Sequence, residues 1–289
     1  MAESAGFKGK VVVVTGAASG IGREIALAFA NRGARLALAD VNGEGLEAVC
    51  AESRSLGCAV FAQLVDVSRA DEVRDFCDNV YREMGRVDVL CNNAGVAVSG
   101  YLEDIPLGDW EWIVGVNLWG VIHGCHFFYP RMIEQGGGGH IVNIASGGGL
   151  FPLPGSIPYS TTKHAVVGLS ETLRAEAALH GIGVTAICPG FVLSGLFSGS
   201  RQNTPRADMS EEEAIRRTEE LLEKLGRTPV KVAKAVVSAV EKNKGLVRIF
   251  TEAYIADYLH RSSRKAFDLL LFKAVKLGRK DMQGASGTE

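Results

Sequence analysis

Short runs of consecutive apolar residues alternate with longer amphipathic stretches along most of this chain. Lys10–Thr15 reads K-V-V-V-V-T, a β-branched run that is typical of a strand covered on both faces. Similar runs predict the remaining strands, which are Arg35–Ala39, Cys58–Val65, Val87–Cys91, His140–Ala145, Val184–Cys188 and Leu246–Phe250.

Helices are predicted between these strands, because apolar positions recur there with helical spacing. Ile25, Ala26 and Phe29 mark one such face in the stretch Ile21–Asn31. Strands that alternate with helices imply right-handed βαβ units. The sequence therefore predicts an α/β fold, a doubly wound (Rossmann) parallel sheet of about seven strands with helices on both faces. The other predicted helices are Asn42–Ser55, Ala70–Met84 and Tyr159–His180.

The alternation continues without a domain linker or a fixed-period repeat. Residues 1–289 are therefore expected to form a single domain. The Gly136–Gly139 run is expected to be a surface loop between a helix and a strand.

Composition and charge narrow the class of protein. The chain has 289 residues, of which 47% are hydrophobic and 22% charged, and its net charge is −2. Nucleic acid is bound by concentrated basic surfaces, and this chain is weakly negative, so no nucleic-acid partner is expected. The N-terminus lacks the apolar core of a signal peptide, and no apolar run is long enough to span a bilayer.

Cysteine usage predicts buried, reduced thiols in a cytoplasmic protein. The six cysteines are scattered, with no C-x-x-C and no Cys/His cluster at metal spacing, so no metal site is expected. They are Cys50, Cys58, Cys77, Cys91, Cys125 and Cys188.

A glycine-rich turn, T-G-A-A-S-G-I-G, follows the first strand from Thr15 to Gly22. Glycines let a backbone turn sharply against a pyrophosphate, and the following helix N-terminus supplies free N–H groups. The turn predicts a dinucleotide site, with an ordinary strand–helix connection as the alternative. The cofactor-binding residues expected in it are Gly16, Ser19, Gly20 and Ile21.

Asp40 ends the second strand, about 20 residues beyond the glycine-rich turn. A carboxylate there can accept hydrogen bonds from the adenosine ribose and would repel a 2′-phosphate, which favours NAD over NADP. Asp40 could also serve as the N-cap of the following helix. Arg23 and Arg35 are nearby cations that leave the cofactor preference open.

Tyr159 and Lys163 lie four residues apart in P-Y-S-T-T-K-H, so they share one face of a helix. A tyrosine pKa near 10 is too high for proton transfer at neutral pH, and a nearby ammonium, together with the positive ring of an oxidised nicotinamide, would lower it. By itself the pair is common on inert helix surfaces. Ser146 ends a strand and can hydrogen-bond a developing alkoxide. Asn117 could order a water that relays protons to Lys163.

Together these residues resemble the short-chain dehydrogenase/reductase family, in its compact single-domain branch. The resemblance covers roughly residues 10–194 and thins out beyond. It rests on T-G-A-A-S-G-I-G, Asp40, Asp66-Val67, N-N-A-G at Asn92–Gly95, Asn117, Ser146, Tyr159-x-x-x-Lys163 and Pro189-Gly190.

The resemblance implies a role for each matching residue. Asn117, Ser146, Tyr159 and Lys163 would form the catalytic tetrad, and Lys163 would also bind the nicotinamide ribose, beside Tyr159. Asp66 and the Val67 backbone would hold the adenine, Asn93 would line the adenosine ribose, and Val192 and Ser194 would contact the carboxamide. The family often has threonine at position 194. NADP-preferring relatives often carry a basic residue at position 19, so Ser19 agrees with NAD.

The resemblance also implies a substrate lid over about residues 194–225 and a homo-oligomer, a tetramer or otherwise a dimer. The segments expected around the nicotinamide are apolar and hold no arginine or lysine; they are Val96–Val98, Gly147–Leu153 and Phe191–Phe197. We therefore expect an NAD(H)-dependent oxidoreductase that transfers a hydride between nicotinamide and the carbinol or carbonyl carbon of a hydrophobic secondary alcohol or ketone.

Two alternatives stay open. One is an NADP-dependent carbonyl or ketoacyl reductase on the same fold, against which Asp40 argues. The other is a catalytically inactive nucleotide-binding scaffold, which would not require Tyr159 and Ser146 together.

A C-terminal helical extension is expected over about residues 251–280, where apolar and basic residues are mixed. The favoured interpretation is one or two amphipathic helices that pack on the domain or on a neighbouring subunit. The less favoured one is peripheral contact with a membrane, from which a lipophilic substrate would be collected.

Overall fold

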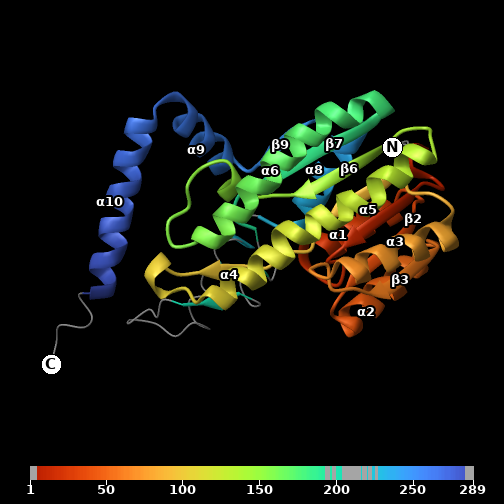
Figure 1. Ribbon diagram of the computed structural model, residues 1–289, viewed down its shortest axis with the longest axis horizontal. Helices are drawn as coiled ribbons and strands as arrows, with labels where there is room; N and C mark the ends of the chain where they lie inside the picture. Colours follow the sequence, from red (N-terminus) through yellow and green to blue (C-terminus); the bar gives the residue numbers. More distant parts are fainter. Residues whose placement is uncertain are drawn as a thin grey trace.

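A seven-stranded parallel sheet forms the centre of the protein in the computed structural model (Figure 1). The structure describes residues 5–192, 196, 200–203, 216, 220, 223–224 and 227–283. The strand order β3-β2-β1-β4-β6-β7-β9 confirms the predicted α/β, doubly wound class. The strands are β1 (Val11–Thr15), β2 (Arg35–Asp40), β3 (Val60–Leu64), β4 (Val89–Asn92), β6 (Gly139–Ile144), β7 (Ile182–Pro189) and β9 (Leu246–Ile249).

Helices cover both faces of the sheet, because the central strands are apolar on both sides. In β1, Val12 and Val14 join one hydrophobic cluster while Val11 and Val13 join the other, as the alternation of side chains along a strand requires. One cluster includes α1 (Gly20–Ala30), α2 (Gly43–Ser55) and α8 (Pro229–Glu241). The opposite cluster includes α3 (Ala70–Met84), α5 (Gly120–Glu134) and α6 (Ile157–Ala177).

One long helical segment and a small second sheet were not predicted from the sequence. The helix α4 (Leu107–Val114) continues through a π-helical turn, Gly115–Trp119, into α5. The strands β5 (Val98–Ser99) and β8 (Arg201–Gln202) pair in parallel beside the main sheet. Short 3-10 turns lie at Ala5–Phe7, Leu102–Asp104, Gly147–Gly149 and Ala178–His180.

Two connecting segments were predicted from the sequence. The loop predicted over Gly136–Gly139 is one residue too long, because Gly139 begins β6 and pairs with Ile182. Most of the expected lid, residues 194–225, lies outside the described residues.

The chain ends in two helices, α9 (Thr251–Ser262) and α10 (Arg264–Gln283), which we call the C-terminal arm. Asp257 of α9 is buried and forms ion pairs with Arg248 of β9, at 2.5 Å, and with Arg261, at 2.8 Å. The second helix, α10, packs mainly against α9 at one end of the molecule (Figure 1). None of the described helices has the length and apolar character needed to cross a membrane.

A buried polar network ties the centre of the sheet to its helices. Asn92 Nδ2 donates to Asn143 Oδ1 at 2.9 Å, and Asn143 Nδ2 donates to Ser170 Oγ of α6 at 3.0 Å. The helix α5 passes so close to this network that a Cβ on Gly124 would overlap Asn92 Oδ1. Only glycine leaves room for the network and the helix together.

We expect Gly124→Ala to lower the free energy of unfolding by about 1–3 kcal/mol, because the added methyl group must displace Asn92 or α5. Urea denaturation measures the change. Gly168→Ala is the matched control, since nothing lies within 4 Å of a Cβ there and alanine favours the helix. Equal stability of the two variants would contradict the close approach of α5 to Asn92.

Candidate active site

One elongated cavity of about 520 Å³ opens at the carboxyl edge of the sheet. The strand order reverses at β1, whose neighbours β2 and β4 lie on opposite sides, and ligands of open α/β sheets bind outside such a point. The residues that line the cavity follow β1, β2, β3, β4, β6 and β7 in turn. A single elongated ligand could therefore contact the ends of all six strands.

The glycine-rich turn brings the N-terminus of α1 against this cavity. Gly16 has φ +64°, and a Cβ on Gly22 would overlap the Gly16 carbonyl oxygen. Ser19 and Ile21 line the cavity with these two glycines, whereas Gly20 does not. The first N–H groups of a helix have no partner within it, so this end of α1 suits a phosphate.

Asp40 is held at the cavity by two backbone N–H groups. Its Oδ2 accepts from Ala18 and its Oδ1 from Asn42, both at 2.9 Å. The N-cap of α2 is Asn42, whose side chain accepts from Gly45 at 3.1 Å, so the N-cap interpretation of Asp40 is wrong.

The two arginines that left the cofactor preference open bond elsewhere. Arg23 pairs with Glu52 at 2.6 Å, and Arg35 donates to the Met84 carbonyl at 3.2 Å. Among the described residues that line the cavity, Lys163 is the only lysine or arginine. The described wall near Asp40 thus offers no cation to a 2′-phosphate.

Asp66, Val67 and Asn93 also line the cavity, as predicted for the adenine and its ribose. Asp66 Oδ1 accepts from the Ser68 N–H at 2.9 Å and from its hydroxyl at 2.7 Å. The amide of Asn93 donates to the carbonyls of Thr15, at 2.9 Å, and Gly16, at 3.0 Å. Asn93 therefore joins the end of β4 to the glycine-rich turn.

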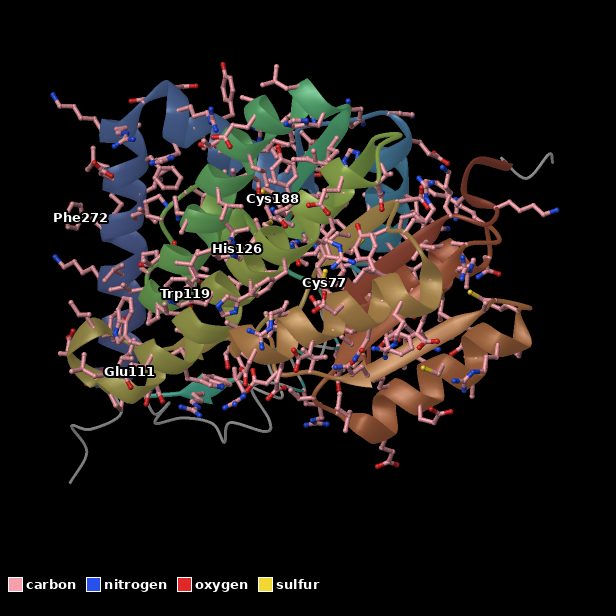
Figure 2. The ribbon with its side chains drawn as sticks, turned by 45° about the vertical axis from the view of Figure 1, so that its right-hand side comes forward. Cys77, Glu111, Trp119, His126, Cys188 and Phe272 are labelled. Atoms are coloured by element: carbon pink, nitrogen blue, oxygen red, sulfur yellow. The ribbon has the colours of Figure 1, made fainter. Side chains whose placement is uncertain are left out.

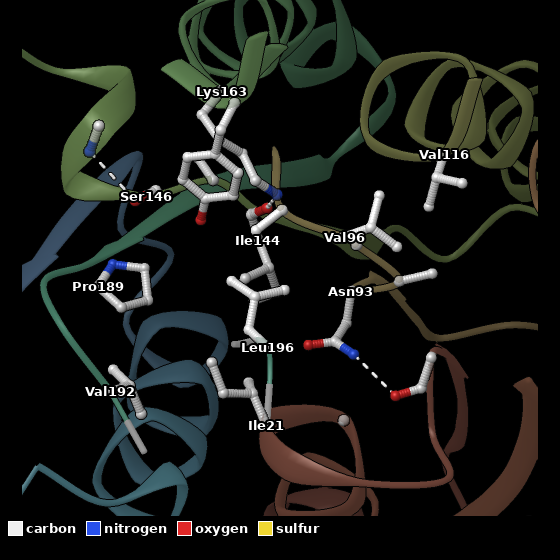
Figure 3. A pocket seen from close by; sticks show the side chains of 18 of the residues that line it. Ile21, Asn93, Val96, Val116, Ile144, Ser146, Lys163, Pro189, Val192 and Leu196 are labelled. Atoms are coloured by element: carbon white, nitrogen blue, oxygen red, sulfur yellow. Dashed lines mark hydrogen bonds between the residues drawn. The ribbon is translucent and has the colours of Figure 1, made fainter. Parts of the chain in front are cut away.

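Ser146 and Lys163 line another part of the cavity (Figure 3). Tyr159 lines the same part, since it hydrogen-bonds Ser146 and its ring lies near Lys163. Ser146 Oγ accepts from the Gly148 N–H at 3.1 Å, which leaves its hydroxyl hydrogen free to donate. Burial raises the pKa of Tyr159, and a hydrogen bond with Ser146 acts in the opposite direction. Ser146 therefore stabilises the phenolate of Tyr159, as a hydroxyl donor does.

Lys163 is buried, with 4% of its surface exposed, and its Nζ donates to the Ile144 carbonyl at 2.9 Å. Burial lowers the pKa of this ammonium to about 8. Its Nζ lies 5.6 Å from the centre of the Tyr159 ring. Among the protein groups alone, burial of the phenol dominates and raises the pKa of Tyr159, whereas the predicted lowering also involves the positive ring of an oxidised nicotinamide.

Asn117 lies in the π-helical turn and is fully buried behind the cavity wall. Its Oδ1 accepts from the Val96 N–H at 2.8 Å, and its Nδ2 donates to the Val96 carbonyl at 2.9 Å and to Thr162 Oγ1 at 3.3 Å. The side-chain amide is thus bonded to protein partners, and Asn117 is not among the residues that line the cavity.

The wall beside Tyr159 is apolar, and the sequence revealed part of it. Val96, Ala97, Phe151, Leu153, Phe191 and Leu196 come from segments already expected there. Trp112 and Val116 were missed because the helix that carries them was not predicted. Glu252 was also missed, since it reaches the cavity from α9 with no motif around it, and it is ion-paired with Arg227. Val192 lines the cavity, and Ser194 lies outside the described residues.

The described part of the chain contains no cluster of three His, Cys, Asp or Glu side chains that could hold a metal ion. All six cysteines are buried and unpaired.

Comparison with known proteins identifies the family. Residues 10–205 match the family model for short chain dehydrogenases. The chain is 37% identical over 249 residues to "Probable oxidoreductase EphD" of Mycobacterium tuberculosis, covering 86% of this chain and 42% of that longer protein. The chain thus spans less than half the length of this relative.

Two solved structures place different cofactors in this fold. A short-chain dehydrogenase/reductase from Burkholderia phymatum in complex with NAD is 33% identical, with a TM-score of 0.81 over 90% of this chain and 95% of that one. An actinorhodin polyketide ketoreductase with NADPH is 32% identical, with a TM-score of 0.74 over 85% of this chain and 97% of that one.

We expect one lysine of the native protein to titrate with a pKa of about 8, because burial disfavours the ammonium of Lys163. Selective ¹³Cε labelling of lysine and NMR over a pH series would show it. Lys163→Met should remove that signal alone. A spectrum in which no lysine titrates below about pH 9 would contradict the burial of this group.

Proposed function

This chain belongs to the short-chain dehydrogenase/reductase family, and on that basis we propose that it is an NAD(H)-dependent alcohol dehydrogenase or ketone reductase. It would transfer a hydride between nicotinamide and the carbinol or carbonyl carbon of a hydrophobic secondary alcohol or ketone. The observation that carries the proposal is the meeting of Ser146, Tyr159 and Lys163 in the same cavity as the glycine-rich turn.

The order of the residues around the cavity supports binding of a dinucleotide. The N-terminus of α1 would hold the pyrophosphate, while Asp40 and Asn93 would lie beside the adenosine ribose and Asp66 and Val67 beside the adenine. Val192, with Ser194, would contact the carboxamide. The bound nicotinamide would supply the hydride acceptor or, in reduction, the donor.

Tyr159 is proposed to move the proton. In oxidation, its phenolate oxygen takes the proton of the substrate hydroxyl as the hydride leaves the carbon, and a carbonyl group forms. The hydroxyl of Ser146 would donate to the oxygen of the substrate or of Tyr159, since its bond with the Gly148 N–H leaves the hydroxyl hydrogen available. In reduction, the same groups act in the opposite order.

Lys163 would bind the nicotinamide ribose and stabilise the phenolate by its charge. Its lowered pKa means that this charge is present below about pH 8 and declines above it. Asn117 acts as a positioning residue, since its side chain fixes Val96 and bonds Thr162, the residue before Lys163.

NAD is proposed over NADP because of the charges around Asp40. The carboxylate would repel a 2′-phosphate, and both Arg23 and Arg35 are bonded to other partners. An NADP-dependent carbonyl or ketoacyl reductase is the second candidate, since a ketoreductase of similar fold holds NADPH.

The apolar wall favours a hydrophobic substrate. Trp112, Phe151 and Leu153 line the cavity that contains Tyr159, and its described lining holds no arginine that could pair with a carboxylate. Burial of such a substrate against this wall stabilises it by about 25 cal/mol for each Å² removed from water.

We also propose a cellular location and an oligomeric state. Six buried, unpaired thiols favour a reducing compartment, for which we propose the cytoplasm. A homo-oligomer, a tetramer or otherwise a dimer, is proposed from the family alone.

We expect Tyr159→Phe to lower kcat by about 10³-fold or more, because it removes the proton-transfer group. Binding of NADH, followed by fluorescence titration, should change little. Tyr129→Phe is the control, since Tyr129 lies on α5 and packs against His180 outside the cavity. A Tyr159→Phe variant that turns over secondary alcohols at the parent rate would refute the mechanism.

We expect Asp40→Ser to weaken NADH binding and strengthen NADPH binding, each by about tenfold, because a carboxylate facing the ribose is lost. Parallel titrations with both cofactors measure the shift. Glu44→Ser removes the same charge from an exposed position in the first turn of α2 and should leave the ratio unchanged. If the parent protein binds NADPH as tightly as NADH, the second candidate function replaces the first.

A further inference from the structure

The C-terminal arm exposes large apolar side chains that the cavity does not use. On α9, Tyr258 is 72% exposed and Ile255 54% exposed. On α10, Phe272 is 77% exposed and Leu269 61% exposed. Figure 2 shows Phe272 pointing away from the body of the protein at its outer edge. Adjacent apolar side chains of this size on a surface indicate contact with another apolar body.

The outer face of α10 combines these apolar residues with lysines. Lys265, Leu269, Phe272 and Lys276 are spaced i, i+4, i+7 and i+11, so they form one stripe along the helix, which we call the outer stripe. The opposite side of α10 faces the protein, where Phe267 is buried and its ring contacts Phe151 and His260. Leu269 and Phe272 therefore cannot be part of the core of this domain.

The charge of the arm differs from that of the whole chain. The helix α10 carries six lysines and arginines against two aspartates, whereas the chain as a whole carries 31 against 33. In the outer stripe a lysine lies on each side of the apolar pair. Lysine beside exposed Leu and Phe on one helix suits a lipid surface with negative headgroups, where the chains bury apolar atoms and the ammonium groups meet phosphate.

A second copy of the chain suits this face less well. A twofold contact through the outer stripe would set Lys265 and Lys276 of one copy against the same stripe of the other. Like charges that meet at an interface oppose association.

The arm is also joined to the apolar wall of the cavity. His260 Nδ1 lies 3.1 Å from the Leu150 carbonyl, and the rings of Phe267 and Phe151 are 6.2 Å apart, edge to face. Phe151 itself lines the cavity. The arm therefore packs directly against one residue of the apolar wall.

We propose that the outer face of the C-terminal arm docks on the surface of a membrane that contains anionic lipid. Docking is peripheral: Leu269 and Phe272 enter the interface, and the lysines contact the headgroups. The proposal concerns surface binding and stands whether or not the cavity performs the function proposed above.

The test uses the full chain in flotation with vesicles of phosphatidylcholine, alone or mixed with phosphatidylglycerol. The protein is expected to float with the mixed vesicles, to remain in solution with the neutral ones, and to be released at high ionic strength. Equal binding to both vesicles, or binding to neither, would overturn the proposal.

The apolar contribution is tested by the double variant Leu269→Ser and Phe272→Ser. We expect its partition to anionic vesicles to fall about tenfold or more, because both side chains leave the interface. The matched control is Leu107→Ser with Leu179→Ser, two leucines that are 80% and 85% exposed outside the arm. Equal losses in the two pairs would overturn the assignment of this face.

The charge contribution is tested by changing Lys265, Lys273 and Lys276 to Gln. Each lysine near an anionic surface contributes about fivefold to partition, so the triple variant should lose about a hundredfold. The same change at three exposed lysines of α8 and its C-terminus should have little effect. These control positions are Lys231, Lys234 and Lys242.

Light scattering of the same variants tests the alternative, in which a second copy of the chain covers the outer face. If a second copy covers this face, the variant Leu269→Ser and Phe272→Ser should fall to a smaller assembly while the parent protein ignores vesicles, and the proposal fails. Unchanged thermal unfolding shows that each variant is folded. If variants at Leu269, Phe272 and the lysines lose vesicle binding but keep hydride transfer, surface docking and the proposed function are tested independently.

Discussion

The architecture of the site depends on the close contact between the ends of β1 and β4. Asn93 donates to the carbonyls of Thr15 and Gly16, and the Thr15 hydroxyl accepts from the Asn93 and Ala94 N–H groups. These bonds fix the glycine-rich turn at the place where the strand order reverses. Because Gly22 must clear the Gly16 carbonyl, the turn also fixes where α1 begins. The cavity for an elongated ligand follows from this local geometry.

A second constraint is that the protein itself buries Tyr159 and Lys163, without any contribution from a ligand. Burial raises the pKa of Tyr159 and lowers that of Lys163, so both side chains are biased toward their neutral forms. Such groups respond strongly to any charge placed beside them, since little water screens them. A cationic ring in the cavity would therefore favour the phenolate far more than the same ring on an exposed surface.

The sequence predicted the class of fold and most of the candidate site, and physical reasons explain the rest. The central strands are β-branched and apolar on both faces, so their position was visible without any contact information. Motif residues such as Ser19, Asp40, Asn93 and Tyr159 follow strands or turns of recognisable composition, and all line the cavity. Trp112 and Glu252 also line the cavity, but only tertiary packing brings them there. The hydrogen bonds between the Asn117 amide and Val96 depend on a π-helical turn, which no local sequence pattern predicts.

The edge strand β9 has a consequence for how this protein is made. The Gly190 N–H donates to the Ile249 carbonyl, so the segment after β7 is held by a residue that lies 59 positions further along the chain. Glu252 then completes the same wall from α9. During synthesis, the ribosome releases the glycine-rich turn, Ser146 and Tyr159 well before β9 can pair with β7. The reactive groups are thus present early in synthesis, but the wall of the cavity is complete only after β9 has paired with β7.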